Sequence, residues 1–188
     1  MKIKILLSLL AVVGCLSTGV TSSVASNSND GRTISVKAND PGIVYEGRCA
    51  VDATGSVRLG FPGVAVHLNF RGSSLTLKAA AADDDLYFDV SVDQAAPTLL
   101  TLHKGEGDYV VMKSGQAADH SVALTRRNES WQGTVAIMGF SFGAGGRLLA
   151  APELPKRKLM FIGDSVTCGE LTAYEAGRDM KARINTNA

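Results

Sequence analysis

The sequence contains few of the residues that build metal centres or disulfide frameworks. It has three cysteines and three histidines in 188 residues, and none of them is grouped at the spacing of a metal site. Three cysteines also cannot form a disulfide framework. The formal net charge of +1 gives no electrostatic reason to expect a nucleic-acid partner. We therefore predict a protein without a metal, a cofactor or a nucleic-acid ligand.

Long hydrophobic runs are also missing, apart from one near the start of the chain. Lys2 and Lys4 precede an apolar stretch over residues 5–13, which is too short to span a bilayer. Small residues would permit cleavage after Ala25, so residues 1–25 predict a signal peptide and an exported protein, periplasmic, extracellular or on the cell surface. The second interpretation is a lipoprotein box at residues 12–15 that would attach lipidated Cys15 to a membrane.

Short alternating strands dominate the middle of the chain, after a polar linker over residues 26–32. Twenty glycines and 45% hydrophobic content are typical of a folded β domain with many turns. We expect residues 71–73 to form a hairpin turn and residues 78–85 a loop. The pattern predicts a mainly β fold over residues 33–150, an antiparallel sandwich of jelly-roll type. The expected strands cover residues 64–70, 75–77, 86–92, 98–102, 109–112, 121–125 and 134–142.

A second structural unit is predicted to begin after a proline-rich linker over residues 151–157. Residues 159–162 are continuously apolar, which is typical of a buried strand of a parallel sheet. Gly163 would let the chain turn sharply at the carboxyl end of that strand. The turn would present the hydroxyl of Ser165 beside outward-pointing N–H groups, the geometry of an acyl-transfer nucleophile. The alternative is that Ser165 only caps a helix.

The run Phe161-Ile162-Gly163-Asp164-Ser165-Val166-Thr167-Cys168-Gly169 resembles the first sequence block of the SGNH (GDSL-type) hydrolases, in the form found in carbohydrate esterase family 2. Segments before it resemble the N-terminal domain of the same family: Gly47-Arg48, Phe61-Pro62-Gly63, Phe70-Arg71-Gly72-Ser73-Ser74-Leu75, Val90-Ser91-Val92-Asp93 and His120-Ser121-Val122-Ala123-Leu124. The sequence Arg126-Arg127-Asn128-Glu129 departs at two positions from the Lys-Arg-Thr-Glu of the family.

This resemblance implies deacetylation of acetylated xylan or mannan, a plant polysaccharide substrate, by a metal-free serine mechanism. It assigns Ser165 as nucleophile and backbone oxyanion donor, and Gly163 and Asp164 as residues that shape the block. The family places the histidine base and the remaining oxyanion donors later in the sequence. Residues 158–188 would thus hold only the first strand, turn and helix of an α/β/α hydrolase domain, so we expect an incomplete chain that is inactive alone.

The three histidines of the sequence all precede Ser165. His67 falls on the outward face of its expected strand, His103 lies beside a glycine-rich turn, and His120 stands at the start of a strand. Surface and turn histidines are commoner than general bases. We therefore do not expect any of the three to activate Ser165.

Other candidates have a functional and a plain interpretation. Trp131 could stack on a sugar ring, although a lone tryptophan at a strand edge more often packs inside. The aspartates of residues 83–85 could bind calcium or form a solvated turn. Arg126 and Arg127, with Glu129, could form an interdomain ion pair or a solvated rim.

Cysteine pairing and overall function also have alternatives. A Cys49–Cys168 bridge is compatible with export, but no pattern argues for it. The alternative to an esterase is a non-catalytic carbohydrate-binding or structural sandwich, in which Ser165 is vestigial.

Overall fold

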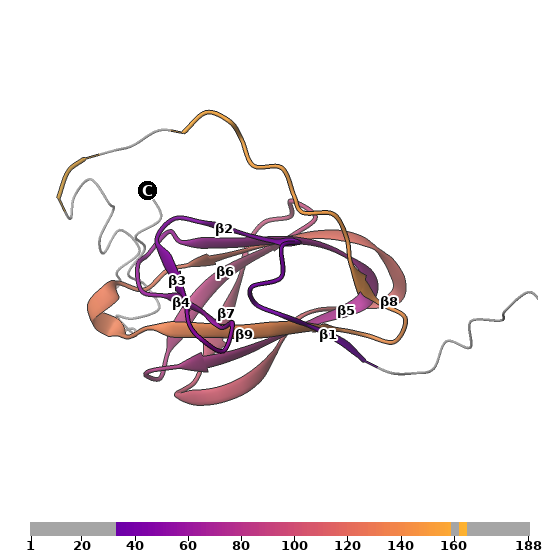
Figure 1. Cartoon of the computed structure of the whole chain (residues 1–188), viewed down its shortest axis with the longest axis horizontal. Helices are drawn as coiled ribbons and strands as arrows, with labels where there is room; N and C mark the ends of the chain where they lie inside the picture. Colours follow the sequence, from indigo (N-terminus) through magenta and orange to yellow (C-terminus); the bar gives the residue numbers. More distant parts are fainter. Residues whose placement is uncertain (1–32, 159–161, 165–188) are drawn as a thin grey trace, which may run out of the picture.

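The computed structural model describes residues 33–158 and 162–164, and its regular structure is almost entirely β. Ten antiparallel strands form one sheet that curls on itself into two layers (Figure 1), as the mainly β prediction requires. No helix in this part of the chain is long and apolar enough to cross a membrane. The elements are β1 (Ile34–Lys37), β2 (Ile43–Glu46), β3 (Cys49–Val51), β4 (Val57–Leu59), β5 (Ala65–Ala81), β6 (Leu86–Val92), β7 (Thr98–Leu102), β8 (Gly105–Arg126), the 3₁₀ turn η1 (Ser130–Gln132), β9 (Val135–Phe142) and β10 (Arg147–Leu148).

Two long strands, β5 and β8, take part in both layers. The first half of β5 pairs with β2 and with the second half of β8, which also pairs with β6. The second half of β5 pairs with the first half of β8 and with β9. The other edge of β9 carries β1 and β4. The two layers are therefore joined by continuous backbone as well as by packing.

The predicted hairpin at residues 71–73 is wrong. β5 runs through these residues, and its register against β8 shifts between Gly72 and Ser74. A two-residue hairpin turn needs backbone in the left-handed region, whereas Gly72 is not among the residues with positive φ. A β-bulge lets a strand bend and continue. Phe70 and Leu75, on either side of the irregularity, are both fully buried, so the bend keeps both halves of the strand on the core.

Two further boundaries differ from the prediction. The strands expected at residues 109–112 and 121–125 are parts of the single strand β8, joined by an exposed polar stretch. The loop expected over residues 78–85 begins later, because β5 continues to Ala81. Ala79 and Ala81 are buried, but alanine is too small to give a clear apolar alternation. The predicted strands over residues 86–92, 98–102 and 134–142 are confirmed to within one residue.

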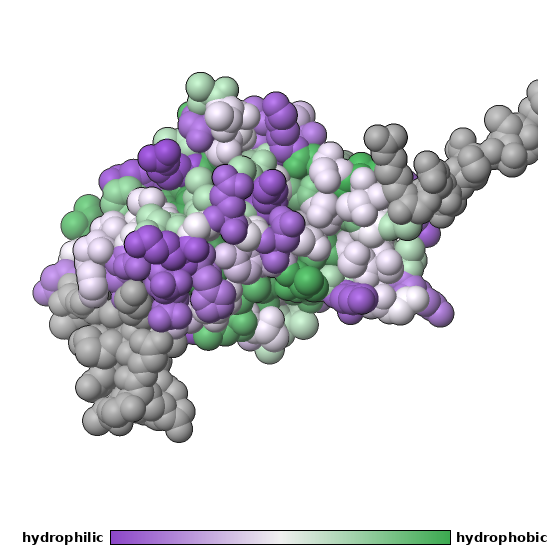
Figure 2. Space-filling view, turned by 90° about the horizontal axis from the view of Figure 1, so that it is seen from below, coloured by the Kyte–Doolittle hydropathy of each residue, from purple (hydrophilic) through white to green (hydrophobic). Residues whose placement is uncertain are grey.

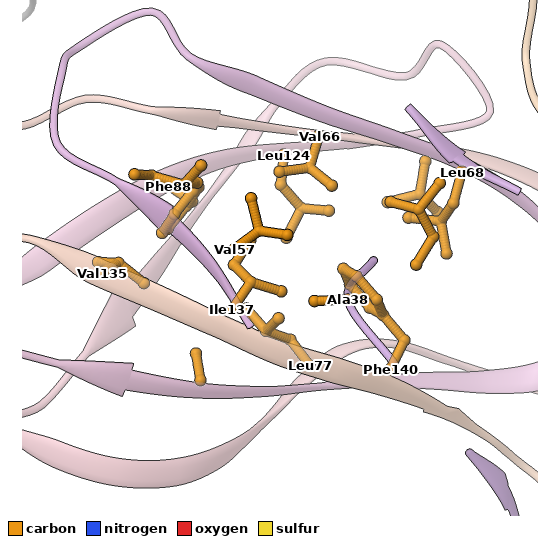
Figure 3. Close-up of a cluster of buried hydrophobic side chains, with 14 of the residues drawn as sticks. Ala38, Val57, Val66, Leu68, Leu77, Phe88, Leu124, Val135, Ile137 and Phe140 are labelled. Atoms are coloured by element: carbon orange, nitrogen blue, oxygen red, sulfur yellow. The ribbon is translucent and has the colours of Figure 1, made fainter. Parts of the chain in front are cut away.

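The core lies between the two layers and is made of aliphatic and aromatic side chains. Figure 3 shows Val57, Val66, Leu77, Phe88 and Ile137, from the four strands β4, β5, β6 and β9, directed toward the same interior space. Burying one such side chain stabilises a fold by about 1.5–3 kcal/mol. The fully buried large side chains of this core are Phe70, Phe88, Phe140, Phe142, Leu59, Leu68, Leu75, Leu77, Leu86, Leu102 and Leu124.

Candidate active site

The described residues just before the predicted nucleophile, 162–164, have no regular structure. Ser165 itself, and most of the predicted strand over residues 159–162, lie outside the described residues. Gly163 and Asp164 are exposed and have no regular structure. Ile162, expected at the end of a buried strand, is 89% exposed and not in a strand. At this residue the prediction of a buried strand is wrong, and the physical reason is that a parallel strand is buried only when neighbouring strands cover it.

The segment that carries the chain from β10 toward Ser165 runs along the outer side of β5. The N–H of Leu149 donates to the carbonyl of Asn69 at 2.8 Å. The side-chain amide of Asn69 donates to the carbonyl of Ala150 at 3.1 Å. Residues 152–155 then share a hollow with His67 and with the neighbouring strands β6 and β8. Prolines at 152 and 155 restrict the backbone of this segment, so its course along the sheet has few alternatives.

An ionic contact holds the end of this segment. Nζ of Lys158 lies 3.0 Å from Oε1 of Glu46, the last residue of β2. Oε2 of the same carboxylate lies 3.5 Å from Nε2 of His67. The hydrogen bond from Lys158 lowers the pKa of Glu46, and the charge of Lys158 and the contact with His67 act in the same direction. Glu46 therefore contacts the chain at the point where it leaves the sheet.

The three histidines are all in the described part of the chain, and two of them contact carboxylates. His67 alternates with buried Val66 and Leu68, as predicted for an outward-facing residue, and contacts Glu46. The ring of His103 is exposed, at the end of β7.

The third histidine, His120, lies well inside β8 rather than at a strand start. Its Nδ1 lies 2.7 Å from Oδ2 of Asp93. The prediction of a strand start was wrong because the polar residues before His120 belong to the same strand. Among the described residues, no group of three His, Cys, Asp or Glu side chains is placed to hold a metal ion.

Several other candidates are placed by the structure. Cys49 is an exposed thiol, while Cys168 lies outside the described residues. Asp84 accepts a hydrogen bond from the backbone N–H of Lys104 at 2.8 Å. Trp131 is 69% exposed, so the expectation that it packs inside is wrong.

Arg126 is the residue that the sequence interpretation misplaced most. We expected an interdomain ion pair or a solvated rim, but Arg126 is fully buried. Its guanidinium donates to the backbone carbonyls of Glu129 and Gly133. Burial lowers the pKa of Arg126 to about 10, against the opposing effect of Glu129. The period-2 pattern of Val122, Leu124 and Arg126 was the available indication, because it places all three on one face of β8.

Residues 45–152 match the family model described as Carbohydrate esterase 2 N-terminal. The chain is 31% identical over 180 residues to a curated protein of Cellvibrio japonicus called acetylxylan esterase / glucomannan deacetylase; the match covers 96% of this chain and 49% of that protein.

Solved structures of family two carbohydrate esterases also match this chain. A family two carbohydrate esterase from Cellvibrio japonicus superimposes with a TM-score of 0.76 and 31% identity, covering 82% of this chain and 46% of the other. A family two carbohydrate esterase from Clostridium thermocellum, in complex with cellohexaose, gives a TM-score of 0.69 and 27% identity, covering 77% and 45%. The chain thus spans about half the length of these relatives. Because the family model matches more than half of its residues, the chain belongs to carbohydrate esterase family 2.

Proposed function

We propose that this chain is the first part of an exported acetylesterase that removes acetyl groups from xylan- or mannan-type polysaccharides, with Ser165 as the nucleophile. The observation that carries the proposal is the match to the Cellvibrio japonicus acetylxylan esterase / glucomannan deacetylase. A match covering 96% of the chain extends beyond the sheet and over the Gly163-Asp164-Ser165 block. The relative solved with cellohexaose supports a carbohydrate ligand for this family.

In the proposed reaction, Oγ of Ser165 attacks the acetyl carbonyl carbon while a base accepts the hydroxyl proton. The tetrahedral intermediate expels the sugar oxygen, which takes up that proton, and leaves an acetyl group on Ser165. Water then attacks the acetyl-serine, releasing acetate and restoring the hydroxyl. The backbone N–H of Ser165 would be one donor to the oxyanion. Gly163 and Asp164 would shape the turn that presents the serine.

The base is expected outside the 188 residues. His67 and His120 contact Glu46 and Asp93, and His103 lies at the end of β7. A serine hydroxyl without a base is a poor nucleophile at neutral pH, and loss of a triad member costs on the order of 10⁴-fold in kcat. We therefore expect the 188 residues alone to hydrolyse an aryl acetate no faster than the background reaction.

The decisive experiment uses the natural protein that contains this chain. Acetate release from acetylated xylan and acetylated glucomannan, and hydrolysis of 4-nitrophenyl acetate, should fall by about 10⁴-fold or more in Ser165→Ala. Ser35→Ala, an exposed serine in β1, is the matched control and should keep full activity. Retained activity in Ser165→Ala would disprove the assignment of the nucleophile. Activity of the isolated 188 residues that Ser165→Ala abolishes would disprove the placement of the base.

Export is a separate part of the proposal, based on the N-terminal pattern of residues 1–25. The intact mass of the protein isolated from its host should correspond to a chain that begins at Ser26. A mass that includes a lipid on Cys15, absent in Cys15→Ser, would favour the lipoprotein interpretation instead. An uncleaved N-terminus would contradict both.

A further inference from the structure

Trp131 is a large aromatic side chain that the fold leaves in water. It is 69% exposed, and it is the only tryptophan in the 188 residues. Tryptophan has an extended apolar face and one polar N–H group, and is often found where a ligand provides the missing contact. A single exposed apolar residue needs no explanation. The turn around this residue, however, is built in an unusual way.

The turn η1 that carries Trp131 is fixed by its neighbours in sequence. The backbone N–H of Glu129 donates to Oε1 of Gln132 at 2.9 Å, and the two residues form a reciprocal capping box. The side chain of Gln132 is buried, with 3% exposed. Glu129 and Gln132, at the two ends of the turn, thus hold each other in place. The turn that carries the indole of Trp131 therefore has a defined shape.

Beneath the turn lie two more buried polar side chains. Arg126 donates to the carbonyls on both sides of η1, those of Glu129 and Gly133. Asn128, fully buried, accepts from the N–H of Tyr87 and donates to the carbonyl of Asp85. Nε and Nη1 of Arg126 and Nε2 of Gln132 are buried with no hydrogen-bond partner in the described part of the chain.

This arrangement is costly for the fold. Burying an unsatisfied polar group costs about 1–3 kcal/mol. Of the four buried polar residues in the described chain, three (Arg126, Asn128 and Gln132) support this one turn. The hydrogen bonds that Arg126 and Gln132 do make hold the turn in one shape, and a rigid binding surface gains affinity because less is lost on ordering it.

A second exposed aromatic residue lies on the adjoining loop. Phe61 is 40% exposed, and the guanidinium carbon of Arg48 lies 4.4 Å from the centroid of its ring. This loop is connected to the Trp131 turn, because the N–H of Gly63 donates to the carbonyl of Arg126 at 2.8 Å. Arg48 follows Glu46 by two residues, and Glu46 holds Lys158. The two aromatic loops and the departure point of the serine segment therefore lie at the same end of the sheet (Figure 1).

We propose that Trp131, together with Phe61 and Arg48, forms a contact site for the backbone of a β-1,4-linked polysaccharide. The flat C–H face of a pyranose ring stacks on an indole or phenyl ring, and a guanidinium donates several hydrogen bonds to hydroxyl oxygens. This polymer is the substrate class of the proposed function, on which the choice of ligand rests. Figure 2 shows hydrophilic and hydrophobic side chains interspersed on the face that is seen from below.

Fluorescence of Trp131 in the 188-residue chain tests the site directly. Titration with xylohexaose, mannohexaose or cellohexaose should shift the emission to the blue and reduce quenching by acrylamide. Trp131→Ala should weaken retention on insoluble xylan or mannan about tenfold or more, and Phe61→Ala should weaken it less. Val110→Ala removes another exposed apolar side chain, on β8, and should leave retention unchanged. No spectral change at saturating oligosaccharide, or unchanged retention of Trp131→Ala, would overturn the proposal.

The same variants in the natural protein separate this site from the esterase. Trp131→Ala should raise the KM for polymeric acetylated substrate more than the KM for 4-nitrophenyl acetate. The glycan titration does not depend on catalysis, so it decides the contact site even where the esterase proposal fails. If acrylamide cannot reach Trp131 in the natural protein before any glycan is added, the residue is covered by another part of that protein, and the contact site is disproved.

Discussion

The core between the layers and the base of the Trp131 turn are both closed to water, but different forces hold them. The core is apolar, with Phe70 stacked on Phe142 at 5.5 Å between ring centroids. The base of the turn is polar and depends on hydrogen bonds from Arg126 and Asn128 to backbone groups. Apolar packing is non-directional and tolerates changes of shape, whereas each polar contact needs its own partner. The comparison indicates that the core stabilises the fold and that the polar base fixes one local shape.

The largest expected effect on stability comes from a substitution in the apolar core. Phe70→Ala removes a fully buried ring that contacts both Phe142 and His120. We expect the free energy of unfolding to fall by about 3–5 kcal/mol, measured by urea denaturation. Leu99→Ala, a half-exposed residue of β7, is the control and should change the free energy by about 0.5 kcal/mol or less. An equal effect of both changes would contradict the assignment of Phe70 to the core.

A smaller effect on stability is expected from a substitution in the polar base of the Trp131 turn. Arg126→Met keeps much of the side-chain volume and removes the unpaired Nε and Nη1, but it leaves two backbone carbonyls without their donor, so the net cost should be about 1–2 kcal/mol. It should also lower the fluorescence anisotropy of Trp131, because the turn loses its support. Arg147→Met, an exposed arginine of β10, should change neither quantity. Loss of stability without any change in Trp131 would mean that Arg126 does not hold the turn.

The smallest effect on stability is expected for the His120–Asp93 pair, which is partly exposed and can be compared with the buried contacts of Arg126. His120 donates from Nδ1 to Asp93, and this hydrogen bond is the main cause that lowers the pKa of Asp93. A depressed pKa means that the pair stabilises the fold above the pKa of the unfolded chain, about 3.9, and that this stabilisation is lost as the pH falls through the lower folded value. Because Asp93 is half-exposed, we expect less than about 1 kcal/mol.

The measurement is the free energy of unfolding of the protein and of Asp93→Asn between pH 6 and pH 3. The variant should lose less stability on acidification than the natural sequence. Parallel curves for the two proteins would show that the pair contributes nothing that depends on the protonation of Asp93.

Local alternation was enough to predict β6, which pairs with β7 and β8, but not the three-residue strand β4, which also has one partner on each side. Leu86, Phe88 and Val90 share one buried face, and the expected strand matches β6. Each long strand that crosses between the layers was predicted as two or more shorter strands, since the residues at its bends resemble turn residues. A strand bend and a hairpin differ in which strand becomes the partner, and pairing is a property of the whole sheet rather than of residues 71–73.

The candidate site was predictable in part. Ser165 follows from the resemblance of its block to a family, and the family itself is confirmed by the match over residues 45–152. The placement of Ser165 lies outside the described residues and stays a prediction. The exposure of Trp131 and the burial of Arg126 could not be read from composition, because a guanidinium is buried only when backbone carbonyls converge on it, and that convergence is created by the turn.

The passage of β5 and β8 through both layers has a mechanical consequence. Neither layer can separate from the other without tearing the hydrogen bonds of two strands that both layers share. A pull on the segment that begins at Leu149, which is attached to Asn69 of β5, is therefore spread over the whole sheet. Tension applied at Leu149 thus meets one cooperative unit rather than a single edge strand.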